Sequence, residues 1–498
     1  MQSGTTVSPL HVTLPSQEEI HNACISGEAA VVQLVPGLVE TIQELLHQME
    51  TQTLMTQELQ AQQAKNSRIS SKPPSSDGLA KKPRPTSLRD QSSRPNGGQP
   101  GHEGHCLEMV THPDQTVAHT VKTCRNCQAS LEHGLVVGYD RRQVFDLPPV
   151  RMAVTEHQVE ICECPHCGHR NQADVPANVT QPTQYGPNVK AHVVYFNHDH
   201  HIPLERTTEI LADVVGPRLS EAVVIEANQE CAAAVESATT CIKEHVKTAS
   251  VVNFDETGIR VQDKLEWLQV ACTPFLTYYQ IHPKRGQEGL NATGILPEFQ
   301  GVAVHDHGDA YFTDETCLHA LCNAHHLRAL KFVQEQYSQP WAGELSDLLV
   351  EIHEEIKRMN PLEAPLPLAQ RQEFERRYDQ IVEQGFASNP PPEKPAGQRG
   401  KVKQSAPKNL LDRLKADKSA VLRFMHDQRV PFDHNQAERD LRMIKVKQKI
   451  SGVFRTKEGA HVFGHIRGYL STAKKNACNI IHAIQRAFEG NPFVPLPT

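Results

Sequence analysis

Three acidic residues stand where carboxylates could share metal ions. Asp255 closes the apolar run 251–254, and Asp306 follows a second apolar run, 302–304. Glu438 lies in a segment whose pattern is typical of a helix. Each acid alone is most simply a surface or capping carboxylate, but acids at neighbouring strand ends repel each other and favour a divalent cation. The order strand, strand, helix therefore predicts a phosphoryl-transfer site in which carboxylates hold two Mg²⁺ ions about 3.5–4 Å apart.

Basic side chains crowd the stretch that follows the third acid. Between Glu438 and Lys457, seven lysine and arginine residues face two acidic ones, which leaves a net charge of about +5. A cationic stretch beside metal-binding carboxylates favours a polyanionic substrate, although a solvated helix face has the same composition. The residues expected to contact nucleic acid are Arg439, Arg442, Lys445, Lys447, Lys449 and Arg455.

Two pairs of cysteines have the spacing of metal ligands. Cys124 and Cys127 form one C-x-x-C pair, and Cys164 and Cys167 form another. Four thiolates from two such turns can hold Zn²⁺ tetrahedrally and leave no open position, which favours a structural site over a catalytic one. Cys162 competes for the fourth ligand position.

The surroundings of these cysteines suit a zinc module. Gly168 directly follows the second pair, where a tight turn needs a glycine. Residues 144–161 alternate well enough to form the hairpins of a zinc ribbon. The chain has 13 cysteines and no recognisable signal peptide, and a reducing compartment keeps such thiols available for metals.

Length and charge set broad limits. A chain of 498 residues suggests roughly three domains of about 150 residues each. Residues 1–4 lack the basic start of a secretory signal, and we expect no stretch to approach the ~20 apolar residues that cross a membrane. A soluble, non-exported protein is the expectation. The net charge of −7 argues against a nucleic-acid partner, but local basic stretches decide the field that such a partner meets.

The first pattern along the chain is a possible coiled-coil seam. Apolar side chains at Leu38, Ile42, Leu45 and Met49 alternate by four and three positions. An amphipathic helix that packs on its own chain has the same pattern. Self-association and packing within the chain therefore both remain open.

Residues 67–105 are rich in Ser, Pro and Gly. Between Arg68 and Arg94, seven basic residues face two acidic ones, a net charge of about +5. Such a stretch cannot bury enough apolar surface to fold alone. It predicts either a flexible arm that contacts phosphates or a solvated linker.

A helix-turn-helix pattern follows within the helical region 186–245. Residues 204–211 are amphipathic, Gly216 and Pro217 supply a turn, and residues 219–224 begin a second helix after Ser220. Helical hairpins that bind no DNA have the same pattern, so both interpretations stand.

The sequence period changes from helix to strand near residue 251. Strand-like runs occupy residues 251–255, 259–261, 265–273, 275–282 and 302–304. Helical patterns dominate from Cys317 onward and are interrupted by a Pro-, Gly- and Lys-rich loop at 389–408. Further helical segments are expected around 431–449 and 457–489.

Several short motifs belong together. The most specific is Val-Pro-Phe-Asp-His-Asn-Gln-Ala-Glu-Arg-Asp-Leu-Arg at 430–442, followed by Lys-Ile-Ser-Gly at 449–452. Supporting motifs are Asp-Glu-Thr-Gly at 255–258, Cys-Asn-Ala-His at 322–325 and Gly-Gly-Gln-Pro-Gly-His at 97–102. Through these motifs the chain resembles the insertion-sequence-66 family of bacterial DDE transposases, from about residue 38 to residue 488.

This resemblance implies an RNase H-like catalytic core. The family's acidic triad falls on Asp255, Asp306 and Glu438, and a mostly helical insertion is expected between the second and third acids. The resemblance also implies that the basic arm, the cysteine pairs and the 186–245 helices bind the ends of the element.

The resemblance also singles out residues near the core. Cys322 and His325 correspond to a C-x-x-H element, and we interpret them as packing or orienting residues, because a lone Cys/His pair rarely binds a metal. Asn435 is expected to support the core as well. His434 departs from the family pattern, which usually has a second asparagine there.

The expected fold class is multidomain α+β: an RNase H-like α/β core with a helical insertion, an N-terminal coiled-coil helix and a zinc ribbon. The expected parts are a leader (1–36), a coiled-coil-like helix (37–66), a basic linker (67–105), a zinc-binding module (106–178), a helical DNA-binding part (179–245), the first half of the core (246–335), a helical insertion (336–415), the second half of the core (416–475) and a C-terminal helix and tail (476–498).

The leading functional hypothesis is a Mg²⁺-dependent transposase that cleaves element ends and joins the freed 3′-hydroxyls to target DNA. The alternatives are a zinc-containing DNA-binding repressor with an inactive core and an RNase H-like nuclease or resolvase. Synapsis of two DNA ends predicts a homo-oligomer, and small companion proteins of the same element are possible partners. No membrane association is expected, and the expected location is the cytoplasm, at the nucleoid.

Overall fold

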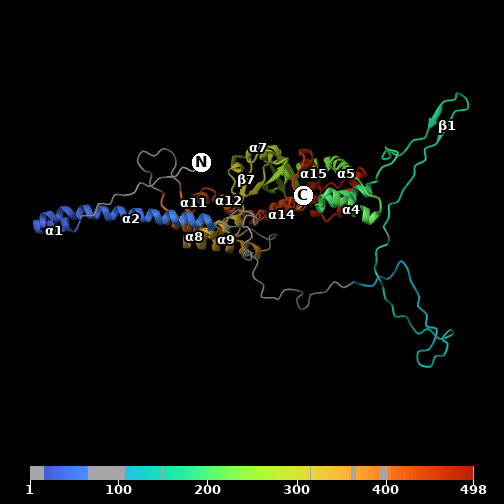
Figure 1. Ribbon diagram of the computed structural model, residues 1–498, viewed down its shortest axis with the longest axis horizontal. Helices are drawn as coiled ribbons and strands as arrows, with labels where there is room; N and C mark the ends of the chain where they lie inside the picture. The colour runs from blue at the N-terminus through green and yellow to red at the C-terminus, as the bar shows by residue number, and fades with distance from the viewer. Residues whose placement is uncertain are drawn as a thin grey trace. The chain divides into compact units, whose positions relative to one another are not determined.

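The computed structural model describes residues 16–64, 107–148, 150–313, 316–359, 366–391, 402 and 404–496. The chain divides into two compact units, and Figure 1 labels helices and strands along the chain. The larger unit comprises Met1–Lys82, Tyr185–Pro203 and Ile225–Thr498, and the smaller comprises Pro83–Gln184 and Leu204–Val224. The predicted basic arm at 67–105 lies outside the described residues.

Two helices open the described chain: α1 (Gln17–Ser26) and α2 (Glu28–Ala64). Ser16 and Glu19 form a reciprocal capping box, in which the Glu19 amide donates to Ser16 Oγ at 3.2 Å and the Ser16 amide donates to Glu19 Oε2 at 2.7 Å. The residues expected as a leader are therefore partly helical, and α2 starts well before the predicted seam. The capping signal lay in a stretch whose apolar pattern is weak.

Three of the four seam residues of α2 face solvent, and Leu38 is half-buried. Ile42, Leu45 and Met49 are all exposed, whereas Ala61, near the end of the helix, is buried against Phe332. Packing within the chain holds for the end of this helix, and self-association through the seam stays a prediction. Its end packs on the same chain, and its seam is uncovered in the single chain.

One part of α2 is more apolar than we expected. The stretch Glu28–Leu46 has 19 residues and a mean hydropathy of 1.3, so by length and composition alone it could cross a membrane. The expectation that no stretch approaches this limit was wrong, because Ala and Val residues raise the average between a few glutamates. Buried core helices and signal sequences have the same composition, so this is weak evidence for a membrane span.

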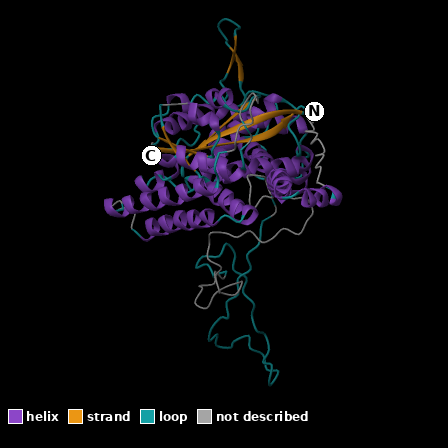
Figure 2. Cartoon of the chain, turned by 90° about the vertical axis from the view of Figure 1, so that its left-hand side faces the viewer, coloured by secondary structure: helices purple, strands orange, loops and turns teal. Residues whose placement is uncertain are grey.

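A five-stranded mixed sheet forms the centre of the larger unit, with helices above and below it (Figure 2). Its strand order is β5-β4-β3-β6-β7. Strand β4 pairs antiparallel with both β3 and β5, whereas β6 pairs parallel to both β3 and β7. The strands are β3 (Val251–Val261), β4 (Lys264–Cys272), β5 (Thr277–His282), β6 (Val302–His305) and β7 (Leu318–Leu321).

Two features of this sheet differ from the sequence-based expectations. The runs 251–255 and 259–261 form one continuous strand, because Gly258 pairs with Trp267 of β4 instead of making a turn. Strand β7 lies in a region expected to be helical, and its four residues gain their conformation from pairing with β6. Tertiary pairing overrides local pattern at both places.

The two faces of the sheet are covered by different helices. On one face, Phe254 of β3 packs with Ile242 of α6 (Glu236–Thr248). On the other face, Ile259 packs with Leu441 of α14 (Asn435–Ser451) and Phe463 of α15 (Lys457–Lys475). Because strand side chains alternate between faces, Asp255 lies on the α14 side of the sheet.

A buried polar network fixes α14 to the sheet. Asp440 Oδ2 lies 2.7 Å from Lys475 Nζ of α15 and accepts a hydrogen bond from Thr277 Oγ1 of β5 at 3.1 Å. The hydroxyl of Tyr279 donates to the backbone carbonyl of Asp440 at 2.9 Å. These contacts determine where Glu438, two residues earlier, can lie.

A helical cluster packs against β6 and β7. Trp341, Tyr378 and Leu411 are among its buried side chains, together with Val304 and Leu321 of the sheet. Its helices are α8 (Asn323–Tyr337), α9 (Pro340–Arg358), α10 (Leu368–Ser388), α11 (Ala406–Ala416), α12 (Lys418–Val421) and α13 (Arg423–His426). Helix α11 begins within the segment expected to be a loop, where Ser405 caps it.

A further helical core contains the C-terminal part of the chain. Tyr469 of α15 and Ile484 of α16 (Ile480–Phe488) pack with Val194 and Cys231. The remaining helices of the described chain are α3 (Pro187–Val194), the π-helical turn η2 (Tyr195–Asp199), α4 (Leu204–Val215), α5 (Glu221–Ala234), α7 (Gln287–Ala292), η3 (Leu296–Glu298) and η4 (Asp309–Thr313). Helices α4 and α5 flank the predicted turn, where Gly216 has a φ of +99°.

Apart from α4 and the first residues of α5, the described part of the smaller unit has little regular structure. Strands β1 (Ile161–Glu163) and β2 (Arg170–Gln172) form a short antiparallel hairpin around the second cysteine pair. The described residues between 144 and 160 contain no strand, so the expected ribbon hairpins are absent there. Val144, Leu147 and Val154 are 91%, 86% and 92% exposed. Their alternating pattern has no packed face that could hold strands together.

The substitution Asp440→Ala tests the network that anchors α14. It leaves the buried Lys475 ammonium without its carboxylate, and we expect the free energy of unfolding to fall by roughly 3 kcal/mol. Denaturant unfolding of the full chain measures this. The exposed Arg442 on the same helix supplies a control, since Arg442→Ala should change stability by less than about 0.5 kcal/mol. Equal effects of the two substitutions would show that the network does not anchor the helix.

Candidate functional site

The sheet register brings two of the predicted acids together. Asn253 of β3 pairs with Val304 of β6 in the parallel ladder, so Asp255 and Asp306, two residues further along each strand, come side by side. Burial raises the pKa of Asp306 above its usual range, and the negative charges of Glu256 and Asp255 raise it further. The fold therefore concentrates negative charge where β6 ends beside β3.

Backbone amides hold both aspartates in place. The Glu256 amide donates to Asp255 Oδ1 at 2.8 Å, and the Gly308 amide donates to Asp306 Oδ1 at 3.1 Å. A side chain at residue 308 would crowd this contact, because its Cβ would lie 3.1 Å from Asp306 Oδ1. Glycine thus permits the loop after β6 to wrap around the carboxylate.

The third predicted acid reaches the same region from α14. Glu438 lies in the first turn of that helix, and its Oε1 is 3.3 Å from Arg328 Nη2 and 4.0 Å from His325 Nε2, both on α8. Arg328 pairs with the carboxylate, and the Asp440 network fixes the helix that carries it. Glu438 is therefore positioned by helices on either side of it.

A pair of histidines connects the acids. His434 Nε2 lies 3.6 Å from Asp255 Oδ2, and the rings of His434 and His325 are 5.1 Å apart. His325 in turn approaches Glu438. Residues from β3, the end of β6, α8 and α14 thus meet in one place, although Glu438 lies far along the chain from Asp255.

The donor set of this place fits Mg²⁺. Carboxylate oxygens are the ligands that hard divalent cations prefer, and a cation relieves repulsion between acids. Burial first, and then the charges of Glu256 and Asp255, raise the pKa of Asp306. Asp255, Asp306 and Glu438 are the residues that would hold the ions.

Glu256 belongs to the site although sequence reasoning did not select it. Tyr311 donates its hydroxyl to Glu256 Oε2 at 2.6 Å, and Arg285 Nε lies 2.9 Å from Oε1. The Arg285 guanidinium also stacks over Trp267, 4.8 Å from its ring centroid. In the sequence, only the position of Glu256 directly after Asp255 could have indicated its role. Its partners Arg285 and Tyr311 lie far along the chain.

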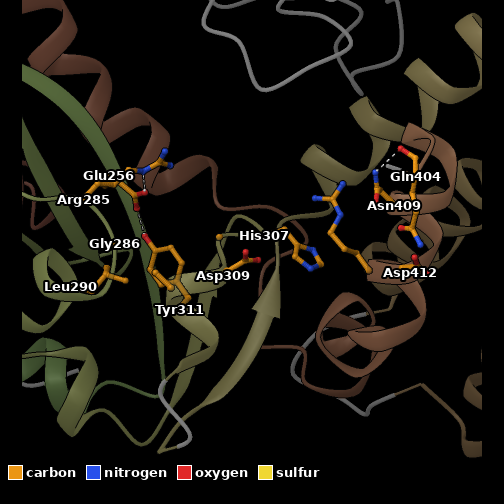
Figure 3. Close-up of a pocket in the computed structure, with 13 residues that line it drawn as sticks. Glu256, Arg285, Gly286, Leu290, His307, Asp309, Tyr311, Gln404, Asn409 and Asp412 are labelled. Carbon is orange, nitrogen blue, oxygen red and sulfur yellow. Dashed lines mark hydrogen bonds and ion pairs between the residues drawn. The ribbon is translucent and has the colours of Figure 1, made fainter. Parts of the chain in front are cut away.

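A cavity of about 1000 Å³ opens beside Glu256, and none of the three predicted acids lines it (Figure 3). One wall carries Glu256, Arg285 and the loop 307–311, which follows Asp306. The opposite wall carries residues of α11 and the segment before it, among them Gln404 and Arg413. The walls carry the arginines Arg285 and Arg413 together with the acids Glu256, Asp309 and Asp412, so the charge of the lining does not by itself select an anionic substrate.

The predicted DNA-contacting residues differ in their surroundings. Arg439, Arg442, Lys445, Lys449 and Arg455 are exposed. Lys447 instead lies 3.8 Å from the centroid of the Phe454 ring and donates to the Gly452 carbonyl at 3.0 Å. Burial lowers the pKa of Lys447 to about 8. Its contacts favour a packing role over a phosphate contact.

Each predicted cysteine pair forms a tight turn in the smaller unit. Hydrogen bonds from the backbone amides and side chains of the C-x-x-C turns lower the pKa of Cys124 and of Cys164, with Cys127 and Cys167 as the largest contributors. Gly168 has a φ of +67°, as the tight turn requires, and Gln128 has a φ of +62° after the first pair. Both turns thus favour thiolates, which are the form that binds a metal.

Cys162, the competing ligand, has different surroundings. Its thiol donates to Glu160 Oε1 at 3.2 Å, and this hydrogen bond raises the pKa of Cys162. The environment therefore disfavours a Cys162 thiolate. The four cysteines of the two turns do not form one compact group among the described residues, so the four-thiolate site remains a prediction.

The C-x-x-H residues have a partner that the sequence did not indicate. Among the described residues, the one group of three or more metal-type ligands within 4.8 Å of one another is Cys322, His325 and His434. The premise that Cys322 and His325 form a lone pair was wrong.

Asn435 contacts Asp433 through its amide and side chain, at the start of α14.

Comparison with known proteins identifies the family. Residues 182–462, more than half of the chain, match the Transposase IS66 family. Residues 122–168 match the zinc-finger binding domain of transposase IS66, which supports zinc binding by the segment with the cysteine pairs. Residues 13–108 match a family of unknown function (DUF6444), and no curated protein matches the chain. The chain therefore belongs to the Transposase IS66 family.

Proposed function

We propose that the protein is a Mg²⁺-dependent DDE transposase that cleaves the ends of an insertion sequence and joins the 3′-hydroxyls to target DNA. One observation carries this proposal: Asp255 lies in β3 just past its parallel pairing with β6, Asp306 directly follows β6, and Glu438 approaches from α14 on the same side of the sheet as Asp255. The strand order, with three antiparallel strands extended by two parallel ones, supports an RNase H-like core.

The chain's own residues prepare this site for phosphoryl transfer. Bound Mg²⁺ supplies activation of the attacking oxygen and stabilisation of the leaving oxygen. Arg328 orients Glu438, and the amides of Glu256 and Gly308 orient the two aspartates. Because these groups are held before substrate binds, little reorganisation is needed during the reaction.

DNA is the substrate that the family implies, and the exposed basic side chains on and after α14 provide its phosphate contacts. The zinc module, with Cys124, Cys127, Cys164 and Cys167 as ligands, and the α4–α5 pair would recognise element ends. The exposed seam of α2 would join copies of the chain during synapsis. The proposal also includes small companion proteins of the same element as partners. It places the protein in the cytoplasm, at the nucleoid.

The substitution Asp306→Asn tests the chemistry directly. Purified protein is incubated with end-containing DNA, target DNA and Mg²⁺, and both cleavage and joining are measured. We expect a loss of about 10³-fold or more, because metal-holding carboxylates supply much of the barrier reduction. Asp263→Asn is the matched control, since Asp263 lies in the β3–β4 turn and asparagine tolerates its φ of +62°.

The same assay separates the alternatives. Equal activity of Asp306→Asn and wild type would remove Asp306 from the chemistry. Specific end binding without cleavage in Mg²⁺ or Mn²⁺ would identify a repressor. Cleavage without joining would identify a nuclease or resolvase.

The charge at Asp306 also predicts a pH dependence of stability. Because the folded state raises the pKa of Asp306, it retains the proton at a pH where the unfolded chain has lost it. Stability of metal-free protein should therefore fall as pH rises through this carboxyl's folded pKa. Asp306→Asn removes this loss, so thermal unfolding in EDTA at neutral pH should shift upward by a few degrees. The Mg²⁺-induced shift should disappear, and a variant less stable than wild type in EDTA would contradict the prediction.

Zinc binding by the cysteine turns is tested with Cys164→Ser. This substitution should lower the zinc content of the purified full chain and weaken DNA binding, because the module loses one thiolate. The circular dichroism of the sheet and helices should change little. Cys162→Ser is the control and should retain zinc. Retention of all zinc by Cys164→Ser, or loss by Cys162→Ser, would revise the ligand set.

A further inference from the structure

A second group of metal-type ligands lies beside the acids. Cys322 directly precedes α8, His325 lies in its first turn, and His434 directly precedes α14. One ligand atom from each lies within 4.8 Å of the other two. Cys322 and His434 are each only 1% exposed. A thiol and two imidazoles thus face one another in a place that is largely closed to solvent.

The two rings are oriented in the same way. The Nε2 atom of His434 is directed toward Asp255, at 3.6 Å, and that of His325 toward Glu438, at 4.0 Å. The Nδ1 atom of each ring is buried and has no hydrogen-bond partner. A buried ring nitrogen without a partner is unfavourable, and both histidines belong to the same group as Cys322.

This arrangement matches what a zinc ion requires. Zn²⁺ binds thiolate sulfur and imidazole nitrogen, and soft or borderline ligands favour it over Mg²⁺. A histidine that binds a metal through one ring nitrogen commonly donates the other N–H to a carboxylate, which fixes the ring. Here Asp255 and Glu438 occupy the positions of such carboxylates.

The backbone around the group is already fixed. The His434 amide lies 3.4 Å from Cys322 Sγ, and the Asn323 amide donates to the Phe432 carbonyl at 3.0 Å. The start of α8 is therefore joined to the segment before α14 without a metal ion. The ligand side chains project from these joined segments.

We propose that Cys322, His325 and His434 bind a structural Zn²⁺ ion through the cysteine sulfur and the two Nδ1 atoms. The outer nitrogens of the two histidines then hold the carboxylates of Asp255 and Glu438. This site is distinct from the cysteine turns of the smaller unit and from the carboxylate site for Mg²⁺. Its role is positional, since it fixes the separation of an acid on β3 from an acid on α14.

Metal analysis of the full chain tests the proposal. Wild type should contain one zinc ion per chain more than Cys322→Ser or His434→Asn, and each of these variants should retain the zinc of the cysteine turns. Cys272→Ser is the control, because Cys272 is also fully buried but lies in β4, outside the group. Its zinc content should equal that of wild type. Circular dichroism checks that each variant is folded.

Cobalt substitution provides a measurement that does not depend on the folding of Cys322→Ser. The Cys124→Ser, Cys164→Ser double variant keeps Cys322, so Co²⁺ should still give a thiolate charge-transfer band and tetrahedral d–d bands. Absence of these bands, or equal zinc in wild type and in folded Cys322→Ser, would overturn the proposal. Neither readout uses cleavage, so the result stands apart from that of the transposase assay.

Discussion

Repulsion between half-buried carboxylates is the constraint on which the rest of this structure depends. Parallel pairing of β3 and β6 places Asp255 and Asp306 side by side, with Glu256 close by. Such an arrangement costs stability in a metal-free protein. The fold compensates with amides directed at both aspartates and with the partners of Glu256, namely Tyr311 and Arg285. The site is thus a strained concentration of negative charge that a cation can relieve.

The remaining elements bring the third acid to this charge. Helix α14 is fixed by the buried Asp440–Lys475 pair and by apolar contacts with β3 and β4. Helix α8 supplies Arg328, which pairs with Glu438, and His325, which stands between Glu438 and His434. Distant segments of the chain therefore converge through packing and charge pairing, and each contact limits where a carboxylate can lie.

Much of this could be predicted from local patterns, and the rest depended on contacts between distant residues. Alternation and apolar runs indicated most of the sheet and the helix that carries Glu438. The four residues of β7 have too short a pattern, and Gly258 looked like a turn until its pairing with Trp267 was known. The ribbon hairpins at 144–161 failed for the opposite reason, because alternation without a buried face holds no strand. His434 could not be placed beside Cys322, since 112 residues separate them.

The central claim is that Asp255, Asp306 and Glu438 together hold the catalytic cations. Anomalous diffraction from crystals of the full chain soaked with Mn²⁺ tests it most directly, because manganese replaces magnesium at oxygen sites and can be located by its own signal. The account predicts manganese peaks in contact with all three carboxylates, and none at Cys322. Peaks elsewhere, or peaks bound by the aspartates with Glu438 turned away in a DNA complex, would contradict it.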